Sequence, residues 1–187
     1  KDSNNPLQLK IKISDEILKM PKSNYYPIKS KNYFKKKYLE NPYYDYFVMN
    51  FYKKNKLIFF FICRKIHVKK LDVYIIRVID FYGSIPKRGS LVKNLSEYLK
   101  INNIEYLDML CYGFKKNVLE DIGLLKKNNN QKIPDHFEPF TGKNAQLSFS
   151  ILINKYKRNI LLFKGDGDQD RPNIIKRWKL ELIQPPF

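Results

Sequence analysis

The hydrophobic positions of this chain change their period several times, and these changes predict a succession of strands and helices. Three apolar stretches rich in aromatic and β-branched residues follow one another closely, which is typical of strands. They are Asp45–Phe51, Leu57–Cys63 and Asp72–Phe81. The third is hydrophobic almost throughout, as a central strand with both faces covered should be.

Three more strands are predicted nearer the C-terminus. They cover Ile104–Tyr112, Leu147–Ile153 and Arg158–Phe163, and we expect the last two to form a hairpin. Helices are expected between the strands. Ser30 can cap a helix over 31–40 because its hydroxyl can accept a hydrogen bond from an otherwise unpaired N–H group. Apolar residues recur at helical spacing over 91–99 and over 118–125, which predicts two further helices.

The order helix, three strands, helix, strand, helix, two strands predicts an α/β fold with a mixed sheet and helices on both faces. The first three strands are close enough in sequence to be antiparallel. The strand–helix–strand passage across 72–112 requires a right-handed parallel crossover. We assign residues 1–29 to a polar lead-in segment and residues 30–187 to a single domain, since 187 residues are short for two.

Composition limits the class of protein. The longest apolar run, Leu57–Cys63, is far shorter than the roughly 20 residues of a membrane-spanning helix. Cys63 and Cys111 are too few for a disulfide scaffold and lack the spacing of a zinc site, so a cytoplasmic domain without a bound metal is expected. The chain begins at Lys1 rather than Met, as one part of a longer protein can.

The formal net charge of +18 raises the question of nucleic-acid binding, because basic patches bind phosphate through counterion release. The lysines, however, are scattered along the whole chain rather than clustered, and Lys, Asn, Ile and Tyr are abundant together, as a genome poor in G and C would impose. A basic nucleic-acid-binding domain is therefore the less favoured alternative.

Several short segments add to the order of elements. They are "YFKKKYLENPYYDY" (33–46), "RVIDFYG" (77–83), "CYGF" (111–114), "IPDHFEPF" (133–140) and "GDGDQDRPN" (165–173). Together they resemble GNAT-like acyltransferase-fold proteins of bacterial surface-polysaccharide biosynthesis, in which this region is often the second half of a longer chain. The resemblance implies transfer of an acyl group from acetyl-CoA, or another coenzyme A thioester, to the amine of a small molecule such as a nucleotide-linked amino sugar.

The resemblance also implies a pyrophosphate-binding loop after the central strand, where this chain has "GSIPKRGSL" (83–91). Backbone N–H groups at a helix start favour an anion there. The cofactor-binding candidates are Gly83, Ser84, Lys87, Arg88, Gly89 and Ser90. The glycine pattern is degenerate, with Pro86 where the family has Arg or Gln. Ordinary turn glycines, in a module that keeps the fold and binds a ligand without coenzyme A, are the alternative.

"GDGDQD" places three acids on alternate positions. A calcium loop would need Gly at its sixth position and Glu at its twelfth, but these are Arg171 and Arg177. One interpretation is a substrate site whose carboxylates bind an ammonium group or sugar hydroxyls. The other is a surface turn in which the Asp side chains cap local N–H groups. The substrate-binding candidates are Asp166, Asp168, Asp170, Arg171 and Asn173.

The catalytic candidates are Asp80, Tyr82 and His136. In this fold the thioester lies near the place where two parallel strands separate, so Asp80 and Tyr82 at a strand end could reach it; Asp80 could instead cap the following loop. His136 lies between carboxylates and could titrate near neutral pH as a general base, or serve only as a hydrogen-bonding residue. Cys111 is expected to be a small buried hydrophobe rather than a nucleophile.

Overall fold

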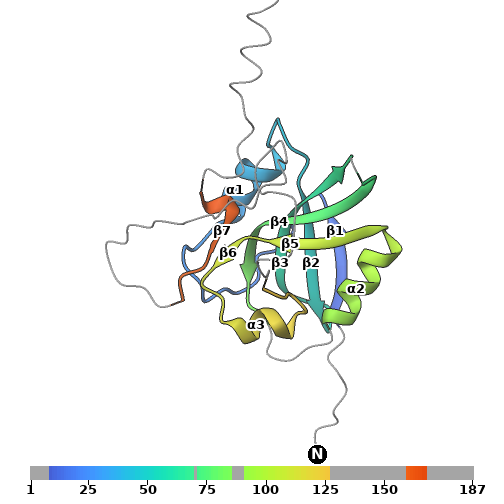
Figure 1. Cartoon of the computed structure of the whole chain (residues 1–187). Helices are drawn as coiled ribbons and strands as arrows, with labels where there is room; N and C mark the ends of the chain where they lie inside the picture. The colour runs from blue at the N-terminus through green and yellow to red at the C-terminus, as the bar shows by residue number, and fades with distance from the viewer. Residues whose placement is uncertain (1–8, 70, 86–90, 127–158, 168–187) are drawn as a thin grey trace, which may run out of the picture.

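A computed structural model describes residues 9–69, 71–85, 91–126 and 159–167 of the chain (Figure 1). Within these ranges the structure is mixed α/β, with one five-stranded mixed sheet, few helices and a second sheet of two short strands. The α/β class and the mixed sheet expected from the sequence are confirmed. None of the described helices is long and apolar enough to cross a membrane.

The large sheet contains five strands in the order of the sequence. They are β1 (Leu9–Ser14), β2 (Phe47–Lys53), β3 (Lys56–Val68), β4 (Val73–Gly83) and β5 (Ile104–Met109). Strands β1 to β4 are antiparallel to their neighbours, and β5 runs parallel to β4. The predicted parallel crossover between the third and fourth expected strands is therefore confirmed, with a helix between them.

Strand β1 lies in the segment assigned from the sequence to a polar lead-in. It pairs with β2 along its whole length, from Leu9 opposite Lys53 to Ser14 opposite Val48. Its apolar residues alternate with lysines, which is the pattern of a strand with one buried face. The high lysine content of the surrounding sequence concealed this short alternation.

Helix α1 (Lys31–Phe34) continues as the π-helix η1 (Lys35–Leu39). The Ser30 hydroxyl accepts a hydrogen bond from the Tyr33 N–H at 3.1 Å, as expected for an N-cap. The other described helices are α2 (Leu91–Ile101), between β4 and β5, and α3 (Lys116–Asp121). All three predicted helices are thus present.

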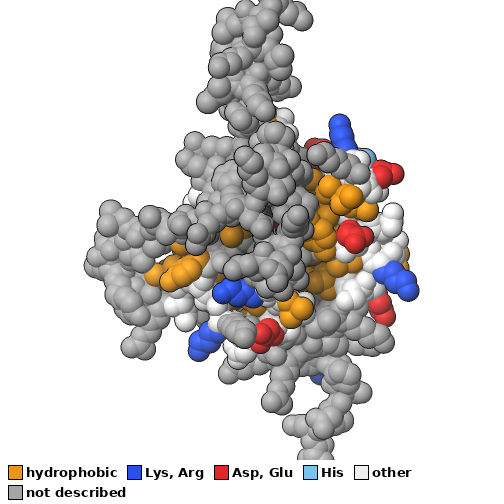
Figure 2. All heavy atoms as spheres, viewed as in Figure 1, with side chains coloured by type: hydrophobic (Ala, Val, Ile, Leu, Met, Phe, Trp, Pro, Cys, Tyr) orange, Lys and Arg blue, Asp and Glu red, His pale blue; other side chains and the backbone are white. Residues whose placement is uncertain are grey.

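Alternate residues of the central strands belong to two different apolar clusters. Phe59 and Phe61 of β3 pack in a cluster that includes Leu95 of α2. Phe60 and Ile62, the intervening residues, pack in a cluster that includes Phe34 and Tyr38 of the first helix. Figure 2 shows hydrophobic side chains gathered over the strands, with charged side chains around their margin.

Strands β4 and β5 pair only as far as Val78 opposite Met109. The next residue of β4, Ile79, is skipped by β3 as well, because Cys63 pairs with Val78 and Ile62 with Asp80. Such a bulge strengthens the local twist of a strand. Beyond it β4 continues to Gly83 without β5 beside it. We call this place the β4–β5 divergence.

The chain leaves β5 at Leu110 and enters the second sheet. Its two strands, β6 (Cys111–Tyr112) and β7 (Leu162–Phe163), are antiparallel. The single strand expected over 104–112 was therefore wrong: it is divided between two sheets. Of the predicted C-terminal hairpin, residues 147–153 lie outside the described residues, and 162–163 form β7, which is followed by the 3₁₀ turn η2 (Lys164–Asp166).

Candidate functional site

Asp80 of β4 forms the centre of a buried polar cluster next to the β4–β5 divergence. Asp80 is fully buried, and both oxygens of its carboxylate accept hydrogen bonds. Oδ1 accepts from Lys29 Nζ at 2.5 Å and from the Phe81 N–H at 2.7 Å. Oδ2 accepts from Tyr38 Oη at 2.8 Å. Among the described residues, no hydrogen bond joins the Asp80 side chain to Gly83 or Ser84, the start of the loop that it was considered to cap.

Asp166, the first acid of "GDGDQD", belongs to the same cluster. Lys29 Nζ lies 2.7 Å from its Oδ1 and 2.9 Å from its Oδ2. Oδ2 also accepts a hydrogen bond from the Phe163 N–H at 2.9 Å, which closes the η2 turn. The structure thus brings together two candidate residues, Asp80 and Asp166, that are far apart in the sequence. The other acids of the motif, Asp168 and Asp170, lie outside the described residues, as do Arg171 and Asn173.

Lys29, which joins the two carboxylates, was not identified from the sequence. Its side chain is 5% exposed, although its neighbour Ile28 is 69% exposed. Lys29 directly precedes Ser30, the cap of α1, so the start of this helix fixes the position of its backbone. Nothing in the sequence distinguishes Lys29 from the many other lysines.

Aromatic rings and a second lysine surround the ammonium group of Lys29. Lys29 Nζ lies 5.7 Å from the ring centroid of Tyr33 and 6.0 Å from that of Phe163, which favours a cation. Lys37 Nζ donates to Tyr33 Oη at 3.1 Å and to the Gly165 carbonyl oxygen. Tyr33 of α1 and Lys37 of η1, one helical turn apart, therefore both contribute to the surroundings of the cluster.

The electrostatics of the cluster follow from burial. Burial raises the pKa of the Asp80 carboxyl, and the adjacent Lys29 ammonium opposes that rise. Burial, followed by the negative charge of Asp80, raises the pKa of the Tyr38 and Tyr33 phenols. Tyr38 thus stays protonated and acts as a hydrogen-bond donor. The cluster thus holds the ammonium group of Lys29 between the carboxylates of Asp80 and Asp166.

The candidate residues that follow Asp80 along β4 lie close by. Tyr82 is half-buried, and its ring packs against those of Phe60 and Phe34. Gly83 has φ of +123°, and a Cβ there would lie 2.5 Å from the Ile58 carbonyl oxygen, so only glycine fits. The Ser84 N–H donates to that same oxygen at 3.2 Å, and the Ser84 hydroxyl donates to the Lys22 carbonyl.

The remaining candidates cannot be placed. Lys87, Arg88, Gly89 and Ser90 of the expected pyrophosphate loop and the candidate base His136 lie outside the described residues.

Cys111 is partly buried, and burial raises the pKa of its thiol to about 11. It is therefore a neutral thiol near pH 7, consistent with the expectation that it is not a nucleophile.

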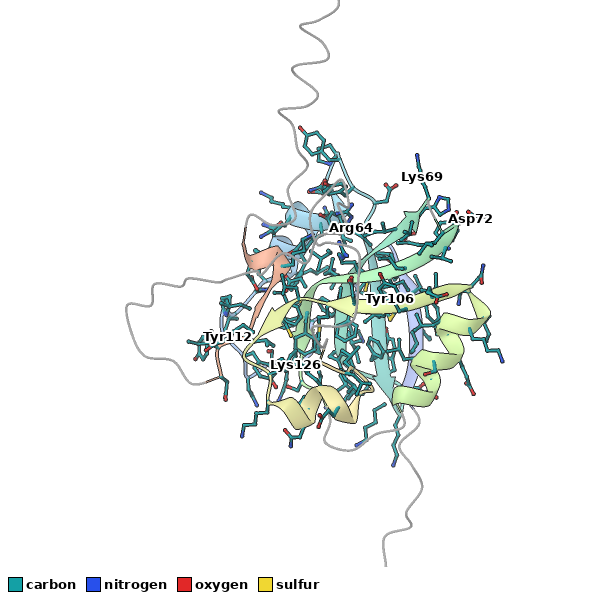
Figure 3. The ribbon with its side chains drawn as sticks, viewed as in Figure 1. Arg64, Lys69, Asp72, Tyr106, Tyr112 and Lys126 are labelled. Atoms are coloured by element: carbon teal, nitrogen blue, oxygen red, sulfur yellow. The ribbon has the colours of Figure 1, made fainter. Side chains whose placement is uncertain are left out.

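A second buried polar group crosses the strands, and the sequence analysis missed it. Arg77 of β4 is in register with Arg64 of β3 on one side and with Asp108 of β5 on the other. Arg77 donates to Asp108 twice, from Nε at 3.0 Å and from Nη2 at 2.8 Å. Figure 3 labels Arg64 of β3 and Tyr106 of β5. One charge within each of two adjacent apolar strands, "YIIRVI" and "YLDML", is the signal that could have predicted the pair.

Arg64 of β3 and Tyr106 of β5 lie on the two strands that flank Arg77. The Arg64 guanidinium lies 3.5 Å from the ring centroid of Tyr44, which is a stacked cation–π contact. Within the part of the chain that the structure describes, no group of three or more His, Cys, Asp or Glu side chains gathers as a metal site would. Two buried ion-pair groups are therefore described: Lys29 with Asp80 and Asp166, and Arg77 with Asp108.

Comparisons with models of protein families, with curated proteins and with solved structures found no match to this chain.

Proposed function

We propose that this chain is a GNAT-like acyltransferase domain that takes part in N-acylation of an amino sugar in bacterial polysaccharide biosynthesis, with an acyl-CoA as donor. The observation that supports the proposal best is the separation of the parallel strands β4 and β5 at the Ile79 bulge. In the fold that the sequence resembles, the thioester lies at such a place. In this proposal α1 and α2 cover opposite faces of the sheet.

The position of the loop after β4 gives further support. Gly83 ends β4, and α2 begins at Leu91, so the intervening segment leads directly into a helix N-terminus. Backbone N–H groups at such a terminus attract phosphate oxygens. In the proposed mechanism, Lys87, Arg88, Gly89 and Ser90 hold the pyrophosphate of the donor.

Acyl transfer to an amine also requires a base and an acceptor site. Because the Asp80 carboxylate accepts hydrogen bonds from Lys29, Tyr38 and the Phe81 N–H, we assign it to the support of the site, and Tyr82 and His136 remain the catalytic candidates. Asp168, Asp170, Arg171 and Asn173 would bind the acceptor. Asp166 would hold the start of that segment in place through Lys29.

A specific observation favours a second candidate function, a ligand-binding module that keeps this fold without coenzyme A. The residues from Phe163 to Asp166 lie beside β4 at the divergence, where a thioester would otherwise lie: Asp166 binds the same ammonium group as Asp80. Such a module needs no catalytic base, which fits the burial of Asp80.

Titration with acetyl-CoA tests the proposal. A ligand that binds only the folded state stabilises it by about 2.7 kcal/mol at 100 times its dissociation constant, so thermal unfolding should shift upward. Arg88→Ala should abolish the shift, and Lys36→Ala, at an exposed position of η1, should retain it. A chain that is unaffected by acetyl-CoA at millimolar concentration would favour the binding module instead.

A further inference from the structure

The segment Phe163–Asp166 lies between the two strands that diverge. On one side, the Lys164 N–H donates to the Leu110 carbonyl at 3.2 Å, and Phe163 pairs with Cys111. Beyond Met109 the chain no longer pairs with β4, and it pairs with Phe163 and Lys164 instead. The segment therefore adjoins the β5 side of the divergence.

The same segment also contacts β4. The ring of Phe163 stacks on that of Phe81 with centroids 5.7 Å apart, and Phe163 is 1% exposed. Gly165 lies so close to β4 that an added Cβ would be 3.0 Å from the Ile79 carbonyl oxygen. With both sides in contact, this short segment fills the place where β4 and β5 separate (Figure 1).

Apolar, backbone and ionic contacts hold the segment there. Its strand, β7, has two residues, and its backbone hydrogen bonds to β6 are correspondingly few. Its described ionic link to β4 depends on one side chain: Lys29 binds Asp80 on β4 and Asp166 on the segment through one ammonium group. Because both ion pairs share Lys29, loss of this one charge releases both.

We propose that Phe163–Asp166 is an internal strap that closes the β4–β5 divergence, and that Lys29 is the latch whose ion pairs keep it closed. A ligand that enters between the strands displaces the strap. The identity of that ligand as a thioester donor rests on the function proposed above, whereas the strap and its latch do not.

Hydrogen exchange followed by mass spectrometry tests the latch. In Lys29→Met, the amides of residues 161–166 should exchange about tenfold or more faster than in the control Lys36→Met, while amides of the central strand β3 stay protected. Asp166→Asn should disturb the fold less, because the asparagine amide oxygen can still accept a hydrogen bond from the Phe163 N–H while the ion pair with Lys29 is lost. It should show the same local acceleration.

Several outcomes decide between the alternatives. If β3 also loses protection in Lys29→Met, the whole fold has opened, and Asp166→Asn decides the question. The latch is contradicted if, in Asp166→Asn, the amides of 161–166 exchange within about twofold of their rate in the control while β3 stays protected.

A further experiment adds acetyl-CoA to the wild-type chain. Binding with faster exchange of 161–166 supports displacement of the strap, and binding that slows this exchange overturns it. Absence of binding contradicts the proposed function alone, since the two variants still decide the latch.

Discussion

Lys29 and Asp80 are 51 positions apart in the chain, yet the Lys29 ammonium lies 2.5 Å from the Asp80 carboxylate at the edge of the β4–β5 divergence. Asp166 completes the arrangement from a third segment. Lys29 therefore connects the start of α1, strand β4 and the segment Phe163–Asp166. Asp80 and Asp166, candidates for catalysis and substrate binding, both bind a cation supplied by the chain itself.

Removal of the Lys29 charge should be costly because it leaves two carboxylates without their cation. We expect Lys29→Met to lower the free energy of unfolding by about 3–5 kcal/mol, measured by urea denaturation. Lys36→Met, at an exposed position of η1, should change it by less than about 0.5 kcal/mol. In a double-mutant cycle, Asp80→Asn should cost less in the Lys29→Met background than in the wild type. Strict additivity of the two effects would show that the pair does not interact.

The Arg77–Asp108 pair should behave in the same way on the other half of β4. Arg77 is 1% exposed, so Arg77→Met leaves a buried carboxylate and should destabilise by about 3–5 kcal/mol. Arg77→Lys keeps the charge but loses the two-point contact, and should fall between Arg77→Met and the wild type. Arg77→Met/Asp108→Leu should recover part of the loss in the same denaturation assay. A double variant less stable than either single variant would contradict a simple ion pair.

The thiol of Cys111 should react slowly with alkylating reagents. Burial raises its pKa from the ordinary value of 9.0 to about 11, and only the thiolate is reactive. Its thiolate fraction at pH 8 is therefore about 100-fold lower than that of an ordinary thiol, and the rate should keep rising with pH up to about 11. Iodoacetamide labelling followed by peptide mass spectrometry measures this, with the urea-unfolded chain as the reference. A rate that levels off near pH 9 would show an unshifted thiol.

The arrangement of β2, β3, β4, the first two helices and the parallel crossover could be predicted from the sequence because each depends on local hydrophobic periodicity. The strand β1 was missed because its alternation is only six residues long. The break at Leu110 was missed because apolar and aromatic residues continue on both sides of it, and periodicity does not show where a strand changes its partner.

The candidate site was predicted in part. Asp80 and Asp166 were singled out, and the structure brings both to one cation, but Lys29 could not be found because a lysine carries no local mark of burial. Whether a carboxylate is free or already paired depends on contacts between distant segments. The sequence therefore singled out both acids, and only the fold shows that each of them binds Lys29.

Gly83 should be irreplaceable at the end of β4, where the expected cofactor loop begins. Its φ of +123° strains any other residue, and a Cβ would meet the Ile58 carbonyl oxygen at 2.5 Å, so part of the backbone must shift. We expect Gly83→Ala to lower the free energy of unfolding by about 2–3 kcal/mol in urea denaturation. Gly123→Ala is the matched control: its φ of +82° is also positive, but the residue is exposed, so only conformational strain of about 1 kcal/mol is expected. If both variants lost the same stability, the close approach of Gly83 to β3 would contribute nothing.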